Sequence, residues 1–525
     1  MTNPITDVKN ADVIFITGSN TTETHPVIGA YVRQAKKDGK KLIIADPVRI
    51  PLAEIADIHL QIHPGTSLAL SHGILHVIFA EGLEDKEYIE QNTEGADALK
   101  ELVKKYTPEY TAKICGVNAN DIIEAARMYA SAGAASILYC MGITQHLNGV
   151  NNVYGLSNLA LATGNLGKPG GGVNPLRGQN NVQGACDVGA LPNVYTGYQP
   201  VTNPEVQIKF EDAWGVKLSG KNGLTSTEAI PAAMDGKVKM LYIVGENPAV
   251  SDPDYRHTAK ALKKAFLVVQ DIFLTETAEM ADVVLPAACF AEKEGTFTNS
   301  DRRVQRVRKA VSAKGMADGD IIVKLMNKLG YNCEYNNAAD VFNEMAALTP
   351  SYAGITYERI EENNGLCWPC PTENHPGTPI LHVGKPAKGK GDFKAVDWAP
   401  SPESQMTDYP VLLVTNRLRH QYHTRTMTAK TKAINEYAPD NFISINPDDA
   451  KNWGVANGDN VKISSPRGFI HARAVIANTV KKGTATMPFH WALGANVLTD
   501  GGALDPVSKI PGLKLAGVKI ERSQI

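Results

Sequence analysis

The sequence of 525 residues has little of what marks a membrane, disulfide-rich or nucleic-acid-binding protein. Its longest apolar runs, such as residues 265–269 and 283–288, have the length of a strand, whereas a membrane helix needs roughly 20 residues. Seven irregularly spaced cysteines do not form a disulfide framework, and a net charge of -2 does not favour a nucleic-acid partner. The start, MTNPITDVKN, lacks the basic and apolar regions of a signal peptide, which predicts a cytoplasmic protein.

Two pairs of residues have the spacing of metal ligands, but neither pair has a second half. Cys367 and Cys370 form a CxxC in the Pro-rich run CWPCPTENHPGTP, and we interpret them as two loop cysteines because no further pair completes a zinc site. His72 and His76 lie four residues apart in an amphipathic helix predicted over 66–82. Their apolar neighbours favour a packing role, so we predict no metal ligand in this chain.

Two stretches of the sequence repeat one pattern. Each begins with an apolar run of strand length that ends in Gly-x-Asn, and continues through a helical stretch into a second apolar run closed by Asp. An Ala-Asp pair then precedes a third apolar run, and the interval between the two aspartates is the same in both copies. The residues concerned are Gly18, Asn20, Asp46 and Asp57 in the first copy, and Gly245, Asn247, Asp271 and Asp282 in the second.

This pattern is typical of a nucleotide-binding β-α-β unit. A glycine at the carboxyl end of a parallel strand lets the backbone approach a ligand, and the next helix offers its N-terminus to a phosphate. The closing acid can accept hydrogen bonds from a ribose or a base edge. One copy would also fit an ordinary tight turn, whereas two matched copies predict two dinucleotide sites related by a pseudo-twofold axis. Neither copy has a complete GxGxxG, which disfavours NAD or FAD.

The pattern changes near the C-terminus. Residues 366–403 are rich in Pro, Gly and Lys, and this composition is typical of an irregular crossing segment. Short β-type runs separated by turns follow, including YPVLLVTN and NFISINPDDA. They predict a small all-β domain, a barrel, over 408–525.

The run over 170–192, GGGVNPLRGQNNVQGACDVGALP, is polar, rich in glycine and without periodicity. Such a run is costly to order unless it lines a site. It closely resembles the active-site segment of molybdenum- or tungsten-dependent formate dehydrogenases, and the resemblance extends over essentially the whole chain, including MGITQHLNG, GENPAVSDPD, EKEGTFTNSDRRVQ and NRLRHQYHTRTMT. Nitrate reductases of the same superfamily share the fold but not RGQNNVQGACD.

The resemblance implies an α/β multidomain bis-molybdopterin oxidoreductase fold. Two pseudo-twofold-related dinucleotide-binding α/β domains would occupy 1–180 and 181–291. A remnant of the N-terminal-type domain with the crossing segment would follow over 292–407, and a double-psi β-barrel over 408–525. By this resemblance each repeated unit holds one guanine dinucleotide of a bis-molybdopterin guanine dinucleotide cofactor, and Mo or W lies between the two dithiolenes.

Matching positions of the family imply a set of cofactor-binding residues. In the first copy they are Gly18, Asn20, Thr21, Thr22, Asp46, Pro47, Arg49, Gly65, Ser67, Met141, Gly142 and Gln145, although relatives often carry Asp where Ser67 stands. In the second copy and the loop before it they are Gly178, Gly245, Glu246, Asn247, Asp271, Thr275, Lys293 and Asp320. In the barrel they are Arg417, Gln421, Tyr422, His423, Thr424, Asn496 and Lys514.

Catalysis is expected to depend on Arg177 and Gln179. Formate is a small planar anion, and a guanidinium fork binds a carboxylate at two points with fixed geometry. Gln179 could orient the substrate or the pterin by hydrogen bonds. An alternative for Arg177 is an ion pair with a cofactor phosphate.

The resemblance also implies features that this sequence does not contain. Family members begin with a domain that binds a [4Fe-4S] cluster, and a Sec or Cys followed by His provides the metal ligand. We therefore expect the chain to be the C-terminal part of a catalytic subunit that works with an electron-transfer iron–sulfur subunit. One hypothesis is a selenoprotein whose UGA codon was taken for a stop. Two alternatives remain, namely another oxidoreductase with the same cofactor, such as a nitrate reductase, and a scaffold subunit without catalysis.

Overall fold

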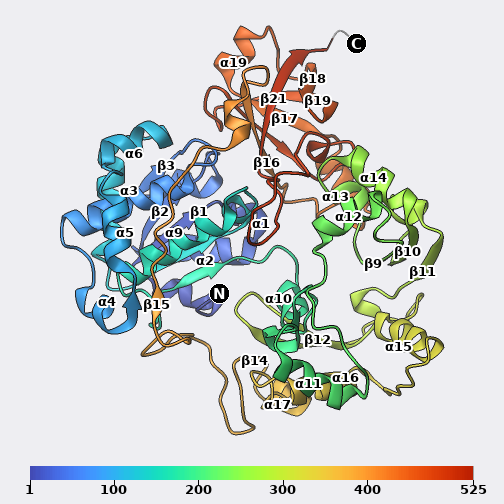
Figure 1. Cartoon of the computed structure of the whole chain (residues 1–525). Coiled ribbons are helices and arrows are strands. Elements are labelled where there is room, and N and C mark those ends of the chain that lie inside the picture. The colour runs from blue at the N-terminus through green and yellow to red at the C-terminus, as the bar shows by residue number, and fades with distance from the viewer. Residues whose placement is uncertain (524–525) are drawn as a thin grey trace. The chain divides into compact units, whose positions relative to one another are not determined.

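The computed structural model describes residues 1–523 of the chain (Figure 1). The chain divides into two compact units. Unit 1 comprises Met1–Leu176, Ala249–His257 and Ile380–Ile525, and unit 2 comprises Arg177–Pro248 and Thr258–Pro379. Within the described residues no helix is both long enough and apolar enough to cross a membrane.

Unit 1 contains a parallel sheet with strand order β3-β2-β1-β5-β6. Because side chains alternate along a strand, each strand contributes to two cores. Val13 and Phe15 pack with α3 (Ser67–Ala80), α7 (Ala119–Ala130) and α9 (Gly149–Ala162) on one face, whereas Ile14 and Ile16 pack with α2 (Pro26–Lys37) on the other. The strands are β1 (Val13–Thr17), β2 (Lys41–Ala45), β3 (Ile58–Leu60), β5 (Ala135–Tyr139) and β6 (Val173–Pro175).

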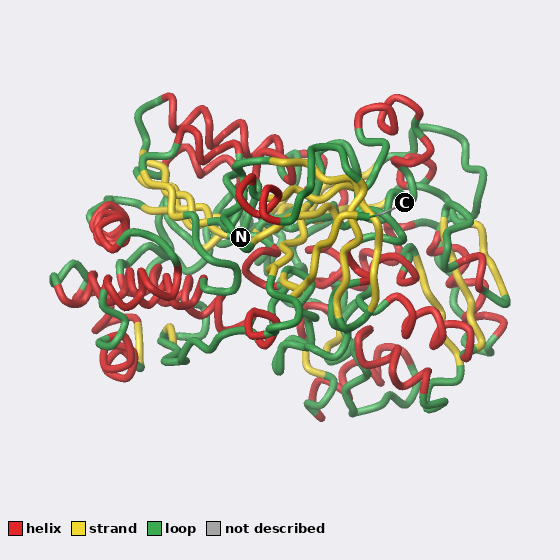
Figure 2. Tube along the Cα trace, turned by 90° about the horizontal axis from the view of Figure 1, so that it is seen from above, coloured by secondary structure: helices red, strands yellow, loops and turns green. Residues whose placement is uncertain are grey.

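The helices of this part of unit 1 follow the strand ends. They are α1 (Thr21–Thr24), α2 (Pro26–Lys37), α3 (Ser67–Ala80), α4 (Lys86–Asn92), α5 (Ala96–Val103), α6 (Pro108–Cys115), α7 (Ala119–Ala130), α8 (Met141–Thr144) and α9 (Gly149–Ala162). In Figure 2 the yellow strands are seen between red helices. The two short strands β4 (Thr93–Glu94) and β15 (Gly391–Asp392) pair with each other and so attach the crossing segment to this part of unit 1.

The helix predicted over 66–82 is present as α3, but the expectation that it is amphipathic was wrong. Ten of its residues are buried, on all sides of the helix. The reason is that α5, α6, α7 and α9 all pack around it. His72 donates from Nε2 to the carbonyl oxygen of Val396 at 2.8 Å, and His76 donates from Nδ1 to that of Val103 at 2.9 Å, so both rings are held by neighbouring backbone.

The C-terminal part of unit 1 is a closed barrel with strand order β16-β20-β17-β19-β18-β21. The pairs β16–β20 and β17–β19 are parallel, and the other neighbours are antiparallel. This confirms the predicted barrel. Its strands are β16 (Val411–Asn416), β17 (Phe442–Ile445), β18 (Asn460–Ser465), β19 (Gly468–Ile476), β20 (Thr484–Pro488) and β21 (Leu515–Arg522), with the helices α18 (Lys432–Tyr437) and α19 (Pro447–Asn452) between them.

The sheet that contains the second copy of the repeat has strand order β11-β10-β9, all parallel. The strands are β9 (Met240–Val244), β10 (Phe266–Asp271) and β11 (Val283–Pro286), and the helices α13 (Pro248–Ser251) and α14 (Tyr255–Lys264) follow β9. The first copy has the same order, β3-β2-β1, so the repeat predicted from the sequence is a repeat in space as well.

The rest of unit 2 surrounds an antiparallel sheet with strand order β12-β13-β14. Its strands are β12 (Gly295–Thr298), β13 (Arg303–Val307) and β14 (Leu366–Cys367), with β7 (Val194–Tyr195) and β8 (Gln199–Pro200) as a separate hairpin. The helices are α10 (Val182–Asp187), α11 (Pro204–Trp214), α12 (Ser226–Met234), α15 (Asp318–Lys328), α16 (Ala338–Leu348) and α17 (Tyr357–Glu362). The domain borders at 180, 291 and 407 stay predictions.

Candidate functional site

The two repeated units make the same turn after their first strand. The amide of Gly18 donates to the carbonyl oxygen of Ala45 at 3.3 Å, and the amide of Gly245 donates to that of Gln270 at 2.9 Å. Both glycines have positive φ, 57° and 65°, a conformation that favours glycine. The turn therefore places Gly18 beside the end of β2, and Gly245 beside the end of β10.

The Ala-Asp pairs also have one structural role in both copies. Asp57 accepts a hydrogen bond from the amide of Leu42, and Asp282 accepts one from the amide of Leu267, each at 2.8 Å. The backbone amides of the two aspartates in turn donate to the carbonyl oxygens of the same two leucines, each at 2.9 Å. These contacts fix the third strand against the start of the second, so these aspartates stabilise the sheet.

Asp46 and Asp271, at the ends of the second strands, each cap the following turn. Asp46 accepts from the amide of Val48 at 2.9 Å, and Asp271 from that of Phe273 at 3.3 Å. Burial raises the pKa of Asp46 to about 6 and also raises the pKa of Asp271. A buried carboxyl group with a raised pKa is suited to accept from a hydrogen-bond donor of a ligand, because such a donor would offset the cost of burying the charge.

The N-terminal turn of α1 has buried polar atoms without partners. The Asn20 Oδ1 and Thr22 Oγ1 atoms are buried and have no hydrogen-bond partner among the described residues. Thr21 between them is fully buried, and its hydroxyl contacts that of Ser19 at 3.0 Å. Unsatisfied buried polar groups are rare because each costs about 1–3 kcal/mol. This turn therefore fits a polar ligand group.

Helix α8 packs directly on the first glycine turn. The amide of Gly142 donates to the carbonyl oxygen of Gly18 at 3.0 Å. A Cβ atom on Gly18 would lie 2.7 Å from the carbonyl carbon of Gly142, so neither position has room for a side chain. Met141 and Gln145 flank this contact, and Gln145 accepts from the amide of Lys514 at 3.2 Å. The expected residues Met141, Gly142 and Gln145 thus lie at the carboxyl end of the sheet beside Gly18.

The barrel contributes two half-buried cations to the same region of unit 1. The Lys514 ammonium donates to the carbonyl oxygen of Thr415 at 3.2 Å, and desolvation lowers its pKa to about 8, opposed by Cys140 and Asp46. The Arg417 guanidinium lies 5.1 Å from the centre of the Tyr422 ring, and burial lowers its pKa. Its Nε has no hydrogen-bond partner among residues 1–523. Both cations therefore suit an anionic ligand.

The loop after Arg417 is held from within the barrel. Burial lowers the pKa of His423 to about 4, and the carbonyl oxygen of His423 contacts Nδ1 of His490 at 2.6 Å. The Thr424 hydroxyl contacts that of Thr426 at 3.0 Å. These contacts fix the backbone of the segment that carries Tyr422, His423 and Thr424.

Several expected binding residues use their side chains inside the protein. The Gln421 amide donates to the carbonyl oxygen of Ala438 at 3.1 Å and accepts from Thr428 at 2.7 Å. The Asn496 amide donates to the carbonyl oxygens of Val250 and Ser251 at 3.0 and 2.9 Å. Four other expected residues of unit 1 also have partners within that unit. Arg49 forms an ion pair with Glu54 at 2.8 Å, and the carbonyl oxygen of Pro47 accepts from the Gln61 amide. The carbonyl oxygen of Gly65 accepts from the Trp398 indole at 3.0 Å, and that of Ser67 accepts from the Ser71 hydroxyl.

In unit 2, Asn247 is also part of the internal hydrogen-bond network. Its amide donates to Glu276 at 2.8 Å and accepts from the hydroxyl of Thr277 at 2.7 Å. The Thr275 hydroxyl accepts from the amide of Ala278 at 3.1 Å. Burial raises the pKa of the neighbouring Glu246. The Gly-x-Asn asparagines thus differ between the copies, since Asn20 keeps a buried oxygen without a partner and Asn247 does not.

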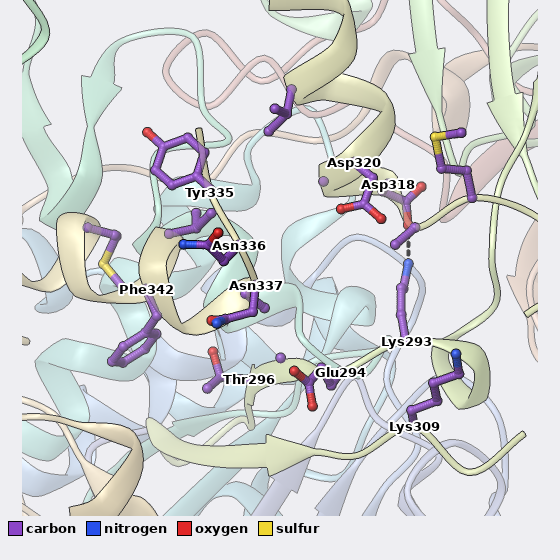
Figure 3. Close-up of a pocket in the computed structure, with 18 of the residues that line it drawn as sticks. Lys293, Glu294, Thr296, Lys309, Asp318, Asp320, Tyr335, Asn336, Asn337 and Phe342 are labelled. Carbon is purple, nitrogen blue, oxygen red and sulfur yellow. Dashed lines mark hydrogen bonds and ion pairs between the residues drawn. The ribbon is translucent and has the colours of Figure 1, made fainter. Parts of the chain in front are cut away.

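Lys293 and Asp320 line a cavity of about 1380 Å³ in unit 2 (Figure 3). Lys293 forms an ion pair with Asp318, which sequence reasoning did not identify. Gln270 of β10 donates to the other oxygen of Asp318 at 2.7 Å, and so connects this ion pair to the end of the sheet. The feature that could have drawn attention to Asp318 is its position in the first turn of α15, where an acidic residue is favourable.

The loop that carries Arg177 lies against the β12–β13 hairpin. The amide of Arg177 donates to the Ser300 hydroxyl at 3.3 Å, and the amide of Thr298 donates to Oδ1 of Asn181 at 2.9 Å. Asn181 has a φ of 61° and immediately precedes α10. Arg177, Gly178 and Gln179 are half-buried. The expected catalytic residues thus lie on one short loop with fixed ends.

No group of three or more His, Cys, Asp or Glu residues within 1–523 is arranged to hold a metal ion. Cys367 and Cys370 are buried free cysteines, and Cys370 contacts the carbonyl oxygen of His375 at 3.3 Å. Cys367 ends β14, so only Cys370 lies in a loop, and the expectation that the pair binds no metal stays a prediction.

Comparison with known proteins accounts for this arrangement. Residues 1–328 match the family model Molybdopterin oxidoreductase, and residues 411–517 match the model "Molydopterin dinucleotide binding domain". The chain is 54% identical to an F420-dependent formate dehydrogenase subunit alpha of Methanocaldococcus jannaschii, covering 99% of this chain and 78% of that protein. It is 40% identical to formate dehydrogenase H of Escherichia coli, covering 99% of this chain and 74% of that protein.

A solved structure shows the same fold at low sequence identity. Acetylene hydratase from Pelobacter acetylenicus superposes with a TM-score of 0.77 at 20% identity, covering 99% of this chain and 81% of that chain. The chain therefore belongs to the molybdopterin oxidoreductase family, and over its length it is similar to formate dehydrogenase alpha subunits.

Proposed function

We propose that this chain carries the catalytic site of a formate dehydrogenase, which interconverts formate and CO2 with the transfer of two electrons. The observation that carries the proposal is the 54% identity to a formate dehydrogenase subunit alpha over 99% of the chain. The loop RGQNN, which contains Arg177, supports it because a small carboxylate needs a cation with two donors.

The cofactor that we propose is Mo or W with two molybdopterin guanine dinucleotides. When bound, this group supplies the redox centre that accepts two electrons from formate. In unit 1, the buried oxygens of Asn20 and Thr22 would receive hydrogen bonds from it, and Asp46 would accept from a ribose or base edge. Arg417 and Lys514 would neutralise its negative charge.

In unit 2 we propose the second dinucleotide at the matching strand ends. The turn at Gly245 has open space where a side chain would stand, and a ligand can approach the backbone there. Asp271, like Asp46, is a carboxyl group with a raised pKa at the end of the second strand. The remaining proposed contacts of this unit are Gly178, Glu246, Thr275, Lys293 and Asp320.

Arg177 binds formate in this proposal. Its guanidinium presents two parallel N–H groups to the two carboxylate oxygens, so that the C–H bond of formate has one fixed direction. Gln179, two residues along the same loop, orients the substrate by a further hydrogen bond. Both side chains extend from a loop whose Arg177 amide donates to the Ser300 hydroxyl and whose Asn181 side chain accepts from the amide of Thr298.

Electrons must leave the site after each turnover, and we propose an iron–sulfur electron-transfer subunit as the partner. Copurification of such a subunit from the source organism tests this. The cytoplasmic location expected from the sequence stays a prediction, to be tested by fractionation of the source cells.

The activity is tested on the native enzyme purified from its source under anaerobic conditions. We expect formate to reduce a viologen dye, and nitrate not to reoxidise the reduced dye. Nitrate-dependent oxidation without formate turnover would contradict the proposal and favour a nitrate reductase. A native protein that contains no Mo or W would contradict it as well and would favour a scaffold subunit.

A further inference from the structure

The carboxylate of Asp187, the last residue of α10, is a buried centre of hydrogen bonds in unit 2. Asp187 as a whole is 1% exposed. Oδ1 accepts from the Tyr198 hydroxyl and from the Gln183 amide, each at 2.8 Å. Oδ2 accepts from the Tyr352 hydroxyl and from the Trp368 indole, each at 2.6 Å. Each oxygen therefore receives two donors, which is what an ionised carboxylate can accept.

Three of these donors come from segments far apart in the sequence. Tyr198 ends a short 3-10 turn over Thr196–Tyr198, Tyr352 follows α16, and Trp368 follows β14. The rings of Tyr198 and Tyr352 each lie 6.4 Å from the ring of Trp368, centre to centre. Asp187 thus fastens the C-terminal end of α10 to three parts of unit 2.

An amide could not replace this carboxylate. Asn has one acceptor oxygen and an NH2 group that only donates. In the place of Asp187 it would direct that NH2 group at two donors, either the pair Tyr198 and Gln183 or the pair Tyr352 and Trp368. Unpaired buried donors cost about 1–3 kcal/mol each, and α10 would shift to relieve them.

The other end of α10 leads directly into the loop of Arg177. Asn181, just before α10, is fixed by the amide of Thr298, and the amide of Arg177 donates to Ser300. The Arg177 guanidinium opposes the rise that burial causes in the pKa of the Cys186 thiol of α10. The loop 177–181 is therefore set by two supports, the β12–β13 hairpin and α10, and Asp187 holds the second.

We propose that Asp187 is a positioning residue for substrate binding. By fixing α10 it sets the direction of the Arg177 guanidinium, and with it the binding of formate. This inference rests on the proposed function. A two-point contact depends strongly on its direction, and a misplacement of about 1 Å can cost on the order of a hundredfold in rate.

The test uses the complete, metal-loaded enzyme with the substitution Asp187→Asn. We expect the KM for formate to rise at least about tenfold while the KM for the viologen dye and the metal content stay at the wild-type values. A merely structural defect would lower the amount of active enzyme and leave both KM values unchanged. Tyr198→Phe removes a single donor, folds more readily, and should raise the KM for formate about two- to threefold.

Asp449→Asn serves as the matched control. Asp449 is a buried carboxylate of the barrel that accepts from the amide of Gly483 at 2.6 Å, in unit 1. This variant should lose stability and keep the KM for formate. A KM for formate within twofold of wild type in both Asp187→Asn and Tyr198→Phe would overturn the proposal.

Hydrogen exchange of the amides over 178–187 separates this inference from the proposed function. We expect faster exchange there in Asp187→Asn, and no change in Asp449→Asn. If the wild-type enzyme does not oxidise formate, the proposed function falls, and exchange alone decides whether Asp187 orders the loop. Unchanged exchange over 178–187 would overturn the positioning role in either case.

Discussion

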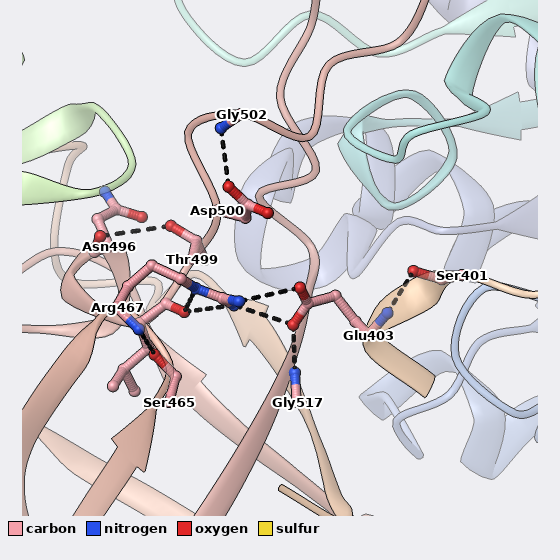
Figure 4. Close-up of polar contacts among 10 residues, drawn as sticks. Ser401, Glu403, Ser465, Arg467, Asn496, Thr499, Asp500, Gly502 and Gly517 are labelled. Carbon is pink, nitrogen blue, oxygen red and sulfur yellow. Dashed lines mark hydrogen bonds and ion pairs between the residues drawn. The ribbon is translucent and has the colours of Figure 1, made fainter. Parts of the chain in front are cut away.

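Arg467, in the turn between β18 and β19, donates two parallel hydrogen bonds to Glu403, in the 3-10 turn Pro402–Gln405 before the barrel, at 3.1 and 2.9 Å (Figure 4). Both side chains are about nine-tenths buried, with 11% and 9% of their surface exposed. Glu403 also accepts from the amide of Gly517 at 2.7 Å, and Arg467 donates to the carbonyl oxygen of Leu498 at 2.8 Å. The pair therefore ties β21 and the turn around Asn496 to the β18–β19 hairpin.

Glu403→Gln should destabilise the barrel strongly. Without the carboxylate the guanidinium of Arg467 is left buried without its charge partner, which typically costs about 3–5 kcal/mol. Chemical denaturation of the purified protein measures this. The control is Glu521→Gln, which removes the exposed pair with Lys519 at 2.8 Å and should cost less than about 1 kcal/mol. Equal losses in the two variants would show that the buried pair has no special role.

His490 should make the protein less stable in acid. Its Nε2 accepts from the amide of Leu418 at 2.9 Å, its Nδ1 contacts the carbonyl oxygen of His423, and burial lowers its pKa to about 3. The folded state therefore binds fewer protons than the unfolded state between about pH 6.5 and 3. Stability is present above pH 6.5 and falls as the pH drops through this window, by up to about 1.4 kcal/mol per pH unit.

His490→Asn keeps a donor toward His423 and removes the titrating ring. We expect its thermal unfolding temperature to fall less steeply between pH 6.5 and 4.5 than that of the wild type. The exposed His471 of β19 provides the control, since His471→Asn should keep the wild-type slope. Identical slopes for all three proteins would refute the assignment.

The two glycine turns should respond differently to alanine. Gly18→Ala and Gly245→Ala both force a positive φ on a residue with a side chain, at a cost of about 1–2 kcal/mol. Only at Gly18 would the new Cβ also meet backbone, 2.7 Å from the carbonyl carbon of Gly142, whereas no atom lies within 4 Å at Gly245. Unfolding of the cofactor-free protein should therefore show a larger loss for Gly18→Ala.

The open space at Gly245 gives this pair of variants a second measurement. Under the proposed function a dinucleotide approaches the backbone there, so Gly245→Ala should reduce the guanine nucleotide released per chain although it loses less stability than Gly18→Ala. A Gly245→Ala enzyme with the wild-type nucleotide content would contradict a dinucleotide at this turn.

The repeat was predictable from the sequence because its signals are local. Strand-length apolar runs, Gly-x-Asn turns and closing aspartates indicated the same β-α-β unit in both copies, and in the structure the two copies have matching strand orders, β3-β2-β1 and β11-β10-β9. The barrel was predictable for the same reason. The all-round burial of α3 was not, because it depends on four helices that pack around it from other parts of the lobe.

Hydrogen-bond partners far apart in the sequence could not be predicted. Nothing in the sequence indicates that Asp187 accepts hydrogen bonds from Tyr352 and Trp368, or that Asp318 forms an ion pair with Lys293. The family pattern gave Asn247 and Gln421 as binding residues, and it could not show that both amides are used within the protein. Local patterns thus predict elements and turns, whereas the partner of a buried polar group is known only from the fold.

The most direct measurement is the formate kinetics of Arg177→Lys in the complete, metal-loaded enzyme. Lys is a point charge without the planar fork, so we expect kcat/KM for formate to fall at least about a hundredfold, with metal content unchanged. Arg308→Lys, at an exposed arginine of the same unit, should keep wild-type kinetics. Formate kinetics near wild type in Arg177→Lys would contradict the account, because the formate would then be bound by another residue.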